Sequence, residues 1–387
     1  MAALRLGLIS PLWPPRGGGG EIYLQRIGTA LAALGVPVAA CVGVAQPDPA
    51  AGVEIAAASL DVDPDDPQAC ARWFPEIERW LDAWRPTHVL VNAPFSRVSH
   101  GHAEPVYAMA RRQGCRTGAV HLDLDRGVVE GLAEAYAATG DWDRAAEEGE
   151  RRLAALADAA CAAIFAEIGS PLVFDCDFIL SCSAWSDRFV DPLGGVPRVV
   201  LHPPIGNSMA GDTSARMSLV DFGFVNPRPH KGGRSLAEIV RRAPESWRFR
   251  ALEGGHGGAF EGFARDIRGA ETRIELIRRV EDMRGFYDGI GALLMASLYE
   301  GYGMVAVEAM IRGTPVVARD YPAIREAVGD GAAIVPFDAT ADEWIEMMAA
   351  VRGNPSRWRA AAARRTAEIA DREVSEIQHF RAFLAEV

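Results

Sequence analysis

Short apolar runs alternate with amphipathic segments along the first half of the chain. The apolar runs have strand length and lie at Leu4–Ile9, Val36–Val42, His88–Asn92, Thr117–His121 and Phe178–Ser183. The segments with apolar residues at helical spacing lie at Glu21–Leu34, Ala71–Trp84 and Glu104–Arg112. Because short strands that alternate with helices build βαβ units, this pattern predicts a mostly parallel sheet. A polar, alanine-rich stretch from Gly127 to Glu167 predicts one or two helices with an acidic face.

A second alternating series follows the small, polar segment 207–217, which we interpret as a linker. Its runs lie at Leu219–Val225, Leu236–Arg242, Phe249–Leu252, Ile274–Ile277 and Ala292–Ala296, and a helical period extends from about Asp342 to Val387. Two such series in 387 residues predict an α/β chain with two doubly wound domains and a ligand crevice between them. We expect domains at 1–206 and 207–365, with 366–387 as a C-terminal helix that packs back on the first domain.

The segment Ser297–Met310 holds the most informative chemistry of the chain. It turns at glycines 301 and 303 and then enters an apolar helix, and Gly313–Ala318 predicts a turn and a further strand after that helix. A glycine-rich turn that feeds a helix directs backbone N–H groups and the positive end of the helix dipole at one point, which suits a phosphate. Glu300 lies before this helix and Glu308 within it, so both can border one crevice. Since carboxylates accept hydrogen bonds from hydroxyls, the pair favours a diphosphate with sugar hydroxyls at both ends, which is a nucleotide sugar.

Two cationic side chains, Arg228 and Lys231, follow the first strand of the second series. Lys231 is the single lysine of an arginine-rich chain, which reflects either chance or function. In open α/β sheets, ligands bind outside the carboxyl ends of the strands, where these two residues are expected. A lysine and an arginine there can neutralise the charge that builds on a departing nucleoside diphosphate.

Three further features have two interpretations each. The cluster Gly17–Gly20 opens a helix after the first strand, so it either approaches an anion or a sugar closely or is a flexible connector. His121 ends a predicted strand and either points into the crevice or is a packed or capping histidine. His256 lies in a glycine-rich loop that is either near the nucleotide or a mobile turn.

Composition excludes several classes of function. A formal charge of −12 without long basic runs disfavours nucleic acid and anionic membranes as partners. No apolar run approaches the ~18 residues that a membrane span needs, and the start lacks the features of a signal peptide. Cysteines without CxxC spacing fit reduced thiols. We therefore expect a cytoplasmic monomer or homodimer without stable membrane insertion.

The DxD pattern of Asp123 and Asp125 is typical of metal-dependent transferases. Asp61 with Asp63 and Asp175 with Asp177 have the same spacing, so the pattern is uninformative here. We predict no metal and no cofactor.

The residues from Glu300 to Glu308 resemble the E-x7-E signature of family 4 retaining glycosyltransferases. These enzymes have the GT-B fold, in which two Rossmann-like domains face a central cleft. Ser181–Phe189 is similar to the strand-serine-helix of that family, and Gly313–Ala318 with Ala323–Gly331 is similar to its GTPVVA…IPEVVGDG stretch. The resemblance covers the last half of the chain strongly and the first half loosely.

This resemblance implies a function for the second domain. A retaining, metal-independent glycosyltransferase would bind a nucleoside-diphosphate sugar, such as a UDP-sugar or GDP-sugar, at 207–365. Glu300 would meet hydroxyls of the transferred sugar, and Glu308 would hold the ribose. Backbone amides near Tyr302, Gly303 and Met304 would hold the diphosphate.

The resemblance also implies that 1–206 binds the acceptor. His121 matches the family histidine beside the donor sugar, and Gly18, Gly19 and Gly20 match the loop near the donor phosphate and the acceptor. Together with Arg228, Lys231 and Glu300, His121 forms the expected catalytic set.

Two positions depart from the family pattern. The family commonly has an arginine where this chain has Asn226, and Arg228 is the obvious substitute. The usual Asn-Gly is missing at Pro204-Ile205, so we expect a differently shaped hinge.

Other functions are compatible with the same pattern. A nucleotide-sugar epimerase would isomerise the donor without an acceptor, and a degenerate protein would bind the nucleotide sugar without turnover. A phosphorylase with pyridoxal phosphate on Lys231 would be longer than this chain. For a transferase we expect a soluble small-molecule acceptor, and the acidic stretch from Gly127 to Glu167 favours a cationic one such as an aminocyclitol.

Overall fold

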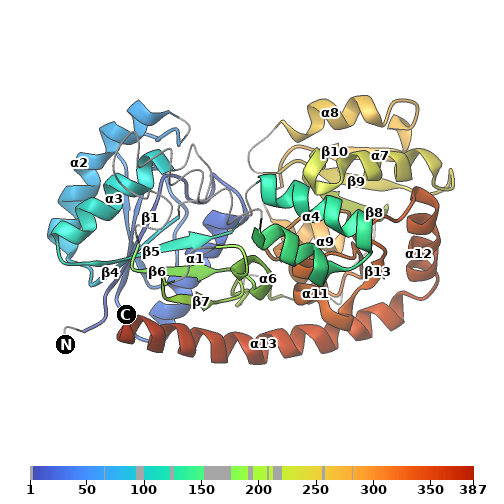
Figure 1. Cartoon of the computed structure of the whole chain (residues 1–387). Coiled ribbons are helices and arrows are strands. Elements are labelled where there is room, and N and C mark those ends of the chain that lie inside the picture. Colours follow the sequence, from blue (N-terminus) through green and yellow to red (C-terminus); the bar gives the residue numbers. More distant parts are fainter. Residues whose placement is uncertain are drawn as a thin grey trace. The chain divides into compact units, whose positions relative to one another are not determined.

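The computed structural model describes residues 3–64, 66–92, 100–122, 126–151, 176–190, 195–206, 209–211, 220–254, 258–280 and 282–387. The chain divides into two compact units (Figure 1). Unit 1 comprises Met1–Pro204 and Glu373–Val387, and unit 2 comprises Ile205–Arg372.

Unit 1 contains a 7-stranded sheet in the order β3-β2-β1-β4-β5-β6-β7, in which all neighbouring strands are parallel. The strands are β1 (Leu6–Ser10), β2 (Val38–Val42), β3 (Val53–Ala57), β4 (His88–Val91), β5 (Arg116–His121), β6 (Phe178–Ser181) and β7 (Arg198–Val200). The helices are α1 (Gly19–Ala33), α2 (Pro67–Trp84), α3 (His100–Arg112), α4 (Arg126–Thr139) and α6 (Ala184–Asp187). The strands β1 and β2 are buried along their whole length, as expected of a parallel sheet with helices on both faces.

Unit 2 contains a 6-stranded parallel sheet in the order β10-β9-β8-β11-β12-β13. Its strands are β8 (Val220–Val225), β9 (Phe249–Leu252), β10 (Ile274–Ile277), β11 (Ile290–Met295), β12 (Val316–Arg319) and β13 (Ala333–Val335). Its α-helices are α7 (Gly233–Arg242), α8 (Ala259–Asp266), α9 (Met283–Asp288), α10 (Met304–Ile311), α11 (Pro322–Val328) and α12 (Ala341–Gly353). Short 3₁₀ turns are η2 (Pro229–Lys231), η3 (Glu271–Arg273) and η4 (Gly329–Gly331).

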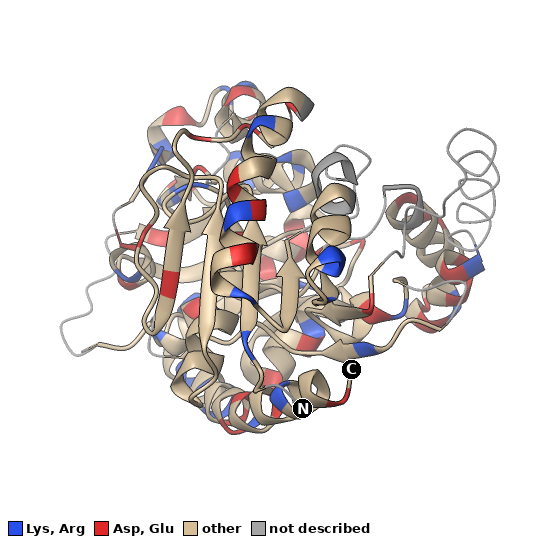
Figure 2. Ribbon diagram, turned by 90° about the vertical axis from the view of Figure 1, so that its left-hand side faces the viewer, with Lys and Arg blue, Asp and Glu red and all other residues tan. Residues whose placement is uncertain are grey.

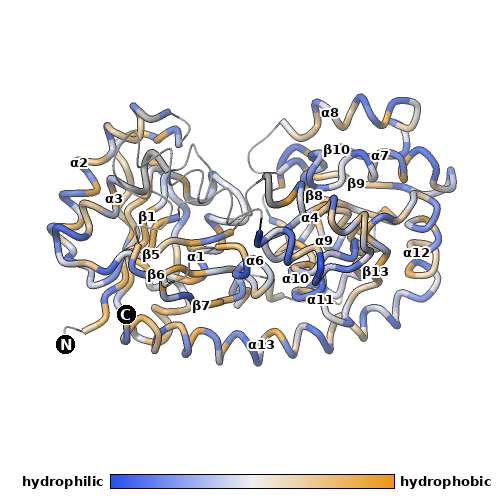
Figure 3. The backbone as a smooth tube through the Cα atoms, viewed as in Figure 1, coloured by the Kyte–Doolittle hydropathy of each residue, from blue (hydrophilic) through white to orange (hydrophobic). Residues whose placement is uncertain are grey.

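The last helix, α13 (Pro355–Glu386), begins in unit 2 and ends in unit 1. Polar and apolar residues alternate along it, as the changing colours in Figure 3 show. Within unit 1, the ring of Phe383 packs edge-on against Phe178 of β6, with 5.8 Å between centroids. The Glu376 carboxylate accepts the backbone N–H of His202 at 3.1 Å and lies 2.6 Å from its ring Nδ1. These contacts fix the end of α13 on unit 1.

Charged residues lie mainly on helices and loops, whereas the strands are largely uncharged (Figure 2). None of the helices in the described part of the chain is both long and apolar enough to cross a membrane. The separation of charge from the strands follows from the burial of both sheet faces.

The predicted α/β class with two doubly wound parallel sheets is confirmed. The strands that the apolar pattern missed, β3, β7 and β13, all lie at a sheet edge. An edge strand has one neighbour only, so its apolar run is shorter or broken by exposed positions. All five residues of β3 are at least partly exposed.

Candidate active site

The topological switch point of unit 2 positions the predicted donor residues. Strand β8 lies between β9 and β11. The chain runs from β8 to β9 and β10 on one side of it and then crosses to β11 on the other side. Loops that diverge at such a point leave room for a ligand outside the carboxyl ends of the two strands. The loops here are 226–232 after β8 and 296–303 after β11. They meet where the Leu298 N–H donates to the His230 carbonyl at 2.9 Å.

Lys231 and Glu300 form an ion pair at this meeting point, with 2.9 Å between Nζ and Oε1. The Ser297 hydroxyl donates to the same Oε1 at 2.7 Å. The Lys231 and Glu300 side chains are 23% and 14% exposed, so water screens the pair only in part. Among the described residues, none hydrogen-bonds to Oε2 of Glu300, which therefore stays available to accept from a ligand hydroxyl.

Gly232 allows the two loops to approach each other so closely. Its φ is +77°, and a Cβ there would lie 2.0 Å from the Ala296 carbonyl oxygen. Any other residue would push the Lys231 turn away from the Glu300 loop.

The N-terminus of α10 begins directly after the Glu300 loop. Gly303 precedes the helix with a φ of +114°, and no side chain caps the first turn. The Tyr302 ring is buried, and its hydroxyl accepts from Arg372 at 2.5 Å. Burial raises the pKa of Tyr302, although Arg372 opposes the shift. The side chain is thus structural, and the backbone amides near Gly303 and Met304 are the groups suited to a phosphate.

Glu308 lies in the second turn of α10 and is buried. The hydroxyl of Tyr287, on α9, donates to its Oε2 at 2.8 Å. Tyr287 is buried as well, and its carbonyl accepts from the Thr314 hydroxyl at 2.9 Å. Sequence reasoning missed Tyr287, because the contact joins two helices and no local spacing signals it. The tyrosine fixes the orientation of the carboxylate that is predicted to hold a ribose.

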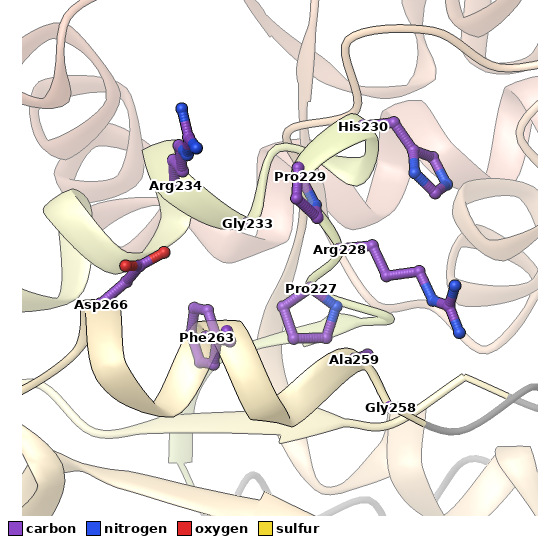
Figure 4. A pocket seen from close by; sticks show the side chains of 11 residues that line it. Pro227, Arg228, Pro229, His230, Gly233, Arg234, Gly258, Ala259, Phe263 and Asp266 are labelled. Carbon is purple, nitrogen blue, oxygen red and sulfur yellow. The ribbon is translucent and has the colours of Figure 1, made fainter.

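Asn226 occupies the position where the resembling family has arginine. Its φ is +56°, and a Cβ on Gly254 would lie 2.6 Å from its Cγ, so the side chain packs over the end of β9. Arg228 follows on the same loop and lines a pocket of about 320 Å³ with His230, Arg234 and Phe263 (Figure 4). Its predicted role as the substitute stays a prediction.

His230 lies between the two cationic residues, and sequence reasoning gave it no role. Its ring stacks on Tyr299 with 5.4 Å between centroids and 26° between planes. Burial lowers the pKa of His230; Lys231 and Arg228 lower it further, and Glu300 opposes them. The ring is therefore neutral near pH 7.

Arg319 connects the end of β11 to two neighbouring segments through hydrogen bonds. It is buried at the carboxyl end of β12, and burial lowers its pKa to about 10 while Asp338 opposes the shift. Its guanidinium donates to the Ala296 carbonyl at 3.0 Å, to the Ser235 hydroxyl at 3.2 Å and to the Phe337 carbonyl. One side chain thus joins the Glu300 loop, α7 and the segment after β13.

In unit 1, the glycine loop lies at the corresponding switch point, between β1 and β4. The Glu21 carboxylate accepts the Gly18 N–H at 2.6 Å and the Asn92 amide at 3.1 Å. Asn92 also donates to the Ser10 hydroxyl at 3.2 Å. A Cβ on Gly20 would lie 2.5 Å from the Leu122 side chain, so the start of α1 lies against the ends of β4 and β5.

His121 ends β5, as predicted, and the residue is only 2% exposed. Burial lowers its pKa to about 3, and a hydrogen bond with the backbone of Ser186 opposes the shift. The ring is therefore neutral and packed within unit 1. Its role beside the donor sugar stays a prediction.

Some sequence-predicted features lie outside the described residues. These are Asp123 and Asp125, His256, much of the linker 207–217 and the acidic stretch beyond Arg151. In the described ranges, no group of three or more His, Cys, Asp or Glu side chains is placed to hold a metal ion.

Comparison with known proteins assigns a family to unit 2. Residues 222–353 match the family model described as Glycosyl transferases group 1. A D-inositol 3-phosphate glycosyltransferase of Nocardia farcinica is 32% identical over 149 residues, which are 35% of this chain and 32% of that protein. The chain thus matches about a third of the length of this curated relative. Unit 2 therefore carries a group 1 glycosyl transferase domain, and the resemblance predicted from the E-x7-E motif is confirmed.

Solved structures match both units. Sucrose-phosphate synthase from Thermosynechococcus elongatus has a TM-score of 0.68 at 15% identity, covering 99% of this chain and 100% of its own. HepE from Anabaena, in complex with UDP-glucose, has a TM-score of 0.67 at 14% identity, covering 99% and 100%. At such identities the likeness shows the fold alone, and it confirms the predicted GT-B class.

Proposed function

We propose that this chain is a retaining glycosyltransferase that moves a sugar from a nucleoside-diphosphate sugar to a hydroxyl of a soluble small-molecule acceptor. The observation that carries the proposal is the Lys231–Glu300 ion pair at the switch point, next to the N-terminus of α10. A cation, a hydroxyl acceptor and a helix N-terminus are the groups that a sugar diphosphate needs. They lie within the domain that matches the group 1 glycosyl transferases.

Each group has a proposed part. Glu300 would use Oε2 to accept from hydroxyls of the donor sugar, while Lys231 and Ser297 hold Oε1. The amides near Gly303 and Met304 would bind the diphosphate. Glu308, oriented by Tyr287, would bind the ribose.

In the proposed reaction, the bond between C1 of the sugar and the β-phosphate oxygen breaks while an acceptor oxygen bonds to C1 from the same face. The acceptor proton passes to the departing phosphate, so the anomeric configuration is kept. Lys231, Arg228 and the first turn of α10 would stabilise the charge that grows on the leaving group. Because fixed cations supply this stabilisation, we propose that the transfer needs no metal.

We place the acceptor on unit 1, where the glycine loop meets the ends of β4 and β5. The acidic helical region supports a cationic acceptor, such as an aminocyclitol. Several of its carboxylates are already paired, since Arg188 lies 2.9 Å from Glu150 and 3.6 Å from Asp143. A cationic acceptor would have to compete for them, and a neutral acceptor that turns over equally well would contradict this choice.

The test begins with a thermal-shift panel of nucleotide sugars, because the true donor stabilises the fold by mass action. The donor is then incubated with candidate acceptors, with and without EDTA, and the product linkage is read by NMR. Retention of configuration, unaffected by EDTA, is the expected result. Isomerised donor in the absence of acceptor would indicate an epimerase, and binding without turnover on any acceptor would indicate a non-catalytic protein.

A further inference from the structure

We propose that His230 is a third cationic ligand of the donor diphosphate and that it takes up a proton from solvent when the diphosphate binds. This inference rests on the proposed function, since the diphosphate is that of the nucleotide-sugar donor. This step is a proton transfer only, and no bond to carbon forms or breaks. The proton is gained on binding and returned when the nucleoside diphosphate leaves.

The backbone and the ring of His230 are both held at the switch point. The residue is part of the η2 turn between Arg228 and Lys231, and its carbonyl accepts the Leu298 N–H at 2.9 Å. Its ring stacks on Tyr299, the neighbour of Glu300. Figure 4 shows that Arg228 and His230 extend to the same side of this turn. An anion that binds Arg228 on this side of the turn therefore also approaches the His230 ring.

The charged groups around His230 explain why it is neutral without a ligand. Arg228 and Lys231 lie on its own turn, and Glu300 lies on the facing loop. Arg234 of α7 and Asp266 of α8 line the same pocket. Burial and the two cations of the turn lower the pKa of His230, whereas Glu300 raises it.

A bound diphosphate changes the sign of this local field. It carries two or more negative charges, which favour the imidazolium over the neutral ring. Since Arg228 and Lys231 would then be paired with phosphate, their repulsion of a third cation would also decrease. A protonated His230 would add a hydrogen-bond donor to the site as the leaving group gains charge.

The experiment measures proton uptake by titration calorimetry with UDP and, in parallel, GDP. Each titration is run at pH 6.5 in two buffers of different ionisation enthalpy, so that the difference in heat gives the number of protons exchanged. The variants are His230→Gln and, as a matched control, His379→Gln, which removes an exposed histidine of α13. The terminal phosphate of free UDP also titrates near this pH, but its contribution is common to all three proteins.

We expect the wild type and His379→Gln to take up about half a proton more per nucleotide than His230→Gln. We also expect His230→Gln to bind up to about tenfold more weakly at pH 6 and equally well at pH 8.5, where the ring is neutral in both states. Rescue of affinity at high pH is a result that a merely structural role of His230 would not give.

Equal proton uptake in His230→Gln and wild type would overturn the inference, as would a loss of affinity of the same size at every pH. In both of these cases the nucleotide still binds, so the proposed function stands. Failure of every nucleoside diphosphate to bind the wild type would overturn the proposed function, and this inference with it.

Discussion

Lys231 and Ser297 bind the same carboxylate oxygen of Glu300, at 2.9 Å and 2.7 Å. The two donors come from different loops, Lys231 from the turn after β8 and Ser297 from the loop after β11. Glu300 is therefore fixed before any ligand arrives, with its second oxygen unused by the described residues. Such preorganisation lowers the ordering cost of binding a sugar hydroxyl.

Replacement of Lys231 should reduce turnover more than any other single change in the turn. We expect Lys231→Ala to lower kcat by ~10²–10³, because it removes a fixed cation from the leaving group. Lys231→Arg is the control; it keeps the charge but not the compact ammonium, so it should be intermediate. Steady-state kinetics on folded protein gives the answer, and a loss below about fivefold for the alanine variant would argue against this role.

The two glutamates should separate binding from transfer. Glu308→Ala should weaken the binding of free nucleoside diphosphate, since the ribose contact is lost, whereas Glu300→Ala should leave that binding intact and impair sugar transfer. Tyr287→Phe should weaken nucleotide binding by less than Glu308→Ala, because it removes only the hydrogen bond that orients Glu308, worth about 1 kcal/mol. Calorimetry distinguishes the variants. If both glutamate variants bind the nucleotide normally, the assignment of Glu308 is wrong.

Gly232→Ala should destabilise unit 2 more than the same change at a glycine with similar backbone but open surroundings. Gly269 has a φ of +89°, and no described atom lies within 4 Å of the place that a Cβ would take, whereas at Gly232 the Ala296 oxygen would lie 2.0 Å away. We expect Gly269→Ala to cost about 1 kcal/mol from backbone strain alone. Gly232→Ala should cost about 1–3 kcal/mol more and also weaken nucleotide binding, because the loops must separate. Urea unfolding measures the first effect, and equal costs at both sites would contradict the close approach.

Arg319 should be needed for the stability of the Glu300 loop. Arg319→Leu leaves buried acceptors at Ala296 and Phe337 without their donor, which costs about 1–3 kcal/mol of unfolding free energy. Arg352→Leu is the control, since Arg352 is 52% exposed and its ion pair with Asp221 is worth little. Denaturant titration compares the two. A variant at Arg319 no less stable than the control would show that the buried hydrogen bonds do not hold the loop.

His121 should make the protein sensitive to acid. Its pKa is about 3 in the folded state and about 6.5 in the unfolded chain. Above pH 6.5 both states are neutral, so the histidine adds no pH dependence there. Between pH 6.5 and 3 only the unfolded state gains a proton, so the unfolding free energy falls by about 1.4 kcal/mol per pH unit.

His121→Gln removes this titration. Between pH 6.5 and 5, the wild type should lose about 2 kcal/mol more than the variant, whatever their difference at neutral pH. Unfolding curves at both pH values give the comparison, and identical pH dependence of the two proteins would mean that His121 is not buried as a neutral ring.

The predicted elements near the site agree with the structure to within a few residues, and the reason is burial. Strands of a parallel sheet bury both faces, so β1 and β11 appear in the sequence as continuous apolar runs between polar segments, and the run of β8 is interrupted only at Asp221. The glycines before α10 and the carboxylates beside them are local signals, because a helix start depends on residues close in sequence. Edge strands such as β3 lack a continuous run and were missed.

The sequence by itself determined the two parallel α/β units, the turn before α10 and the residue types that suit a nucleotide sugar. Only the tertiary structure decided which groups meet. Lys231 and Ser297 bind one oxygen of Glu300, Tyr287 donates to Glu308, and Arg319 donates to the carbonyl of Ala296. The tertiary structure also partly buries His230 beside two cations, which keeps its ring neutral, and packs the Asn226 side chain against Gly254. These relationships depend on strand order, which brings loops distant in sequence to one edge of the sheet, and no local spacing encodes that order.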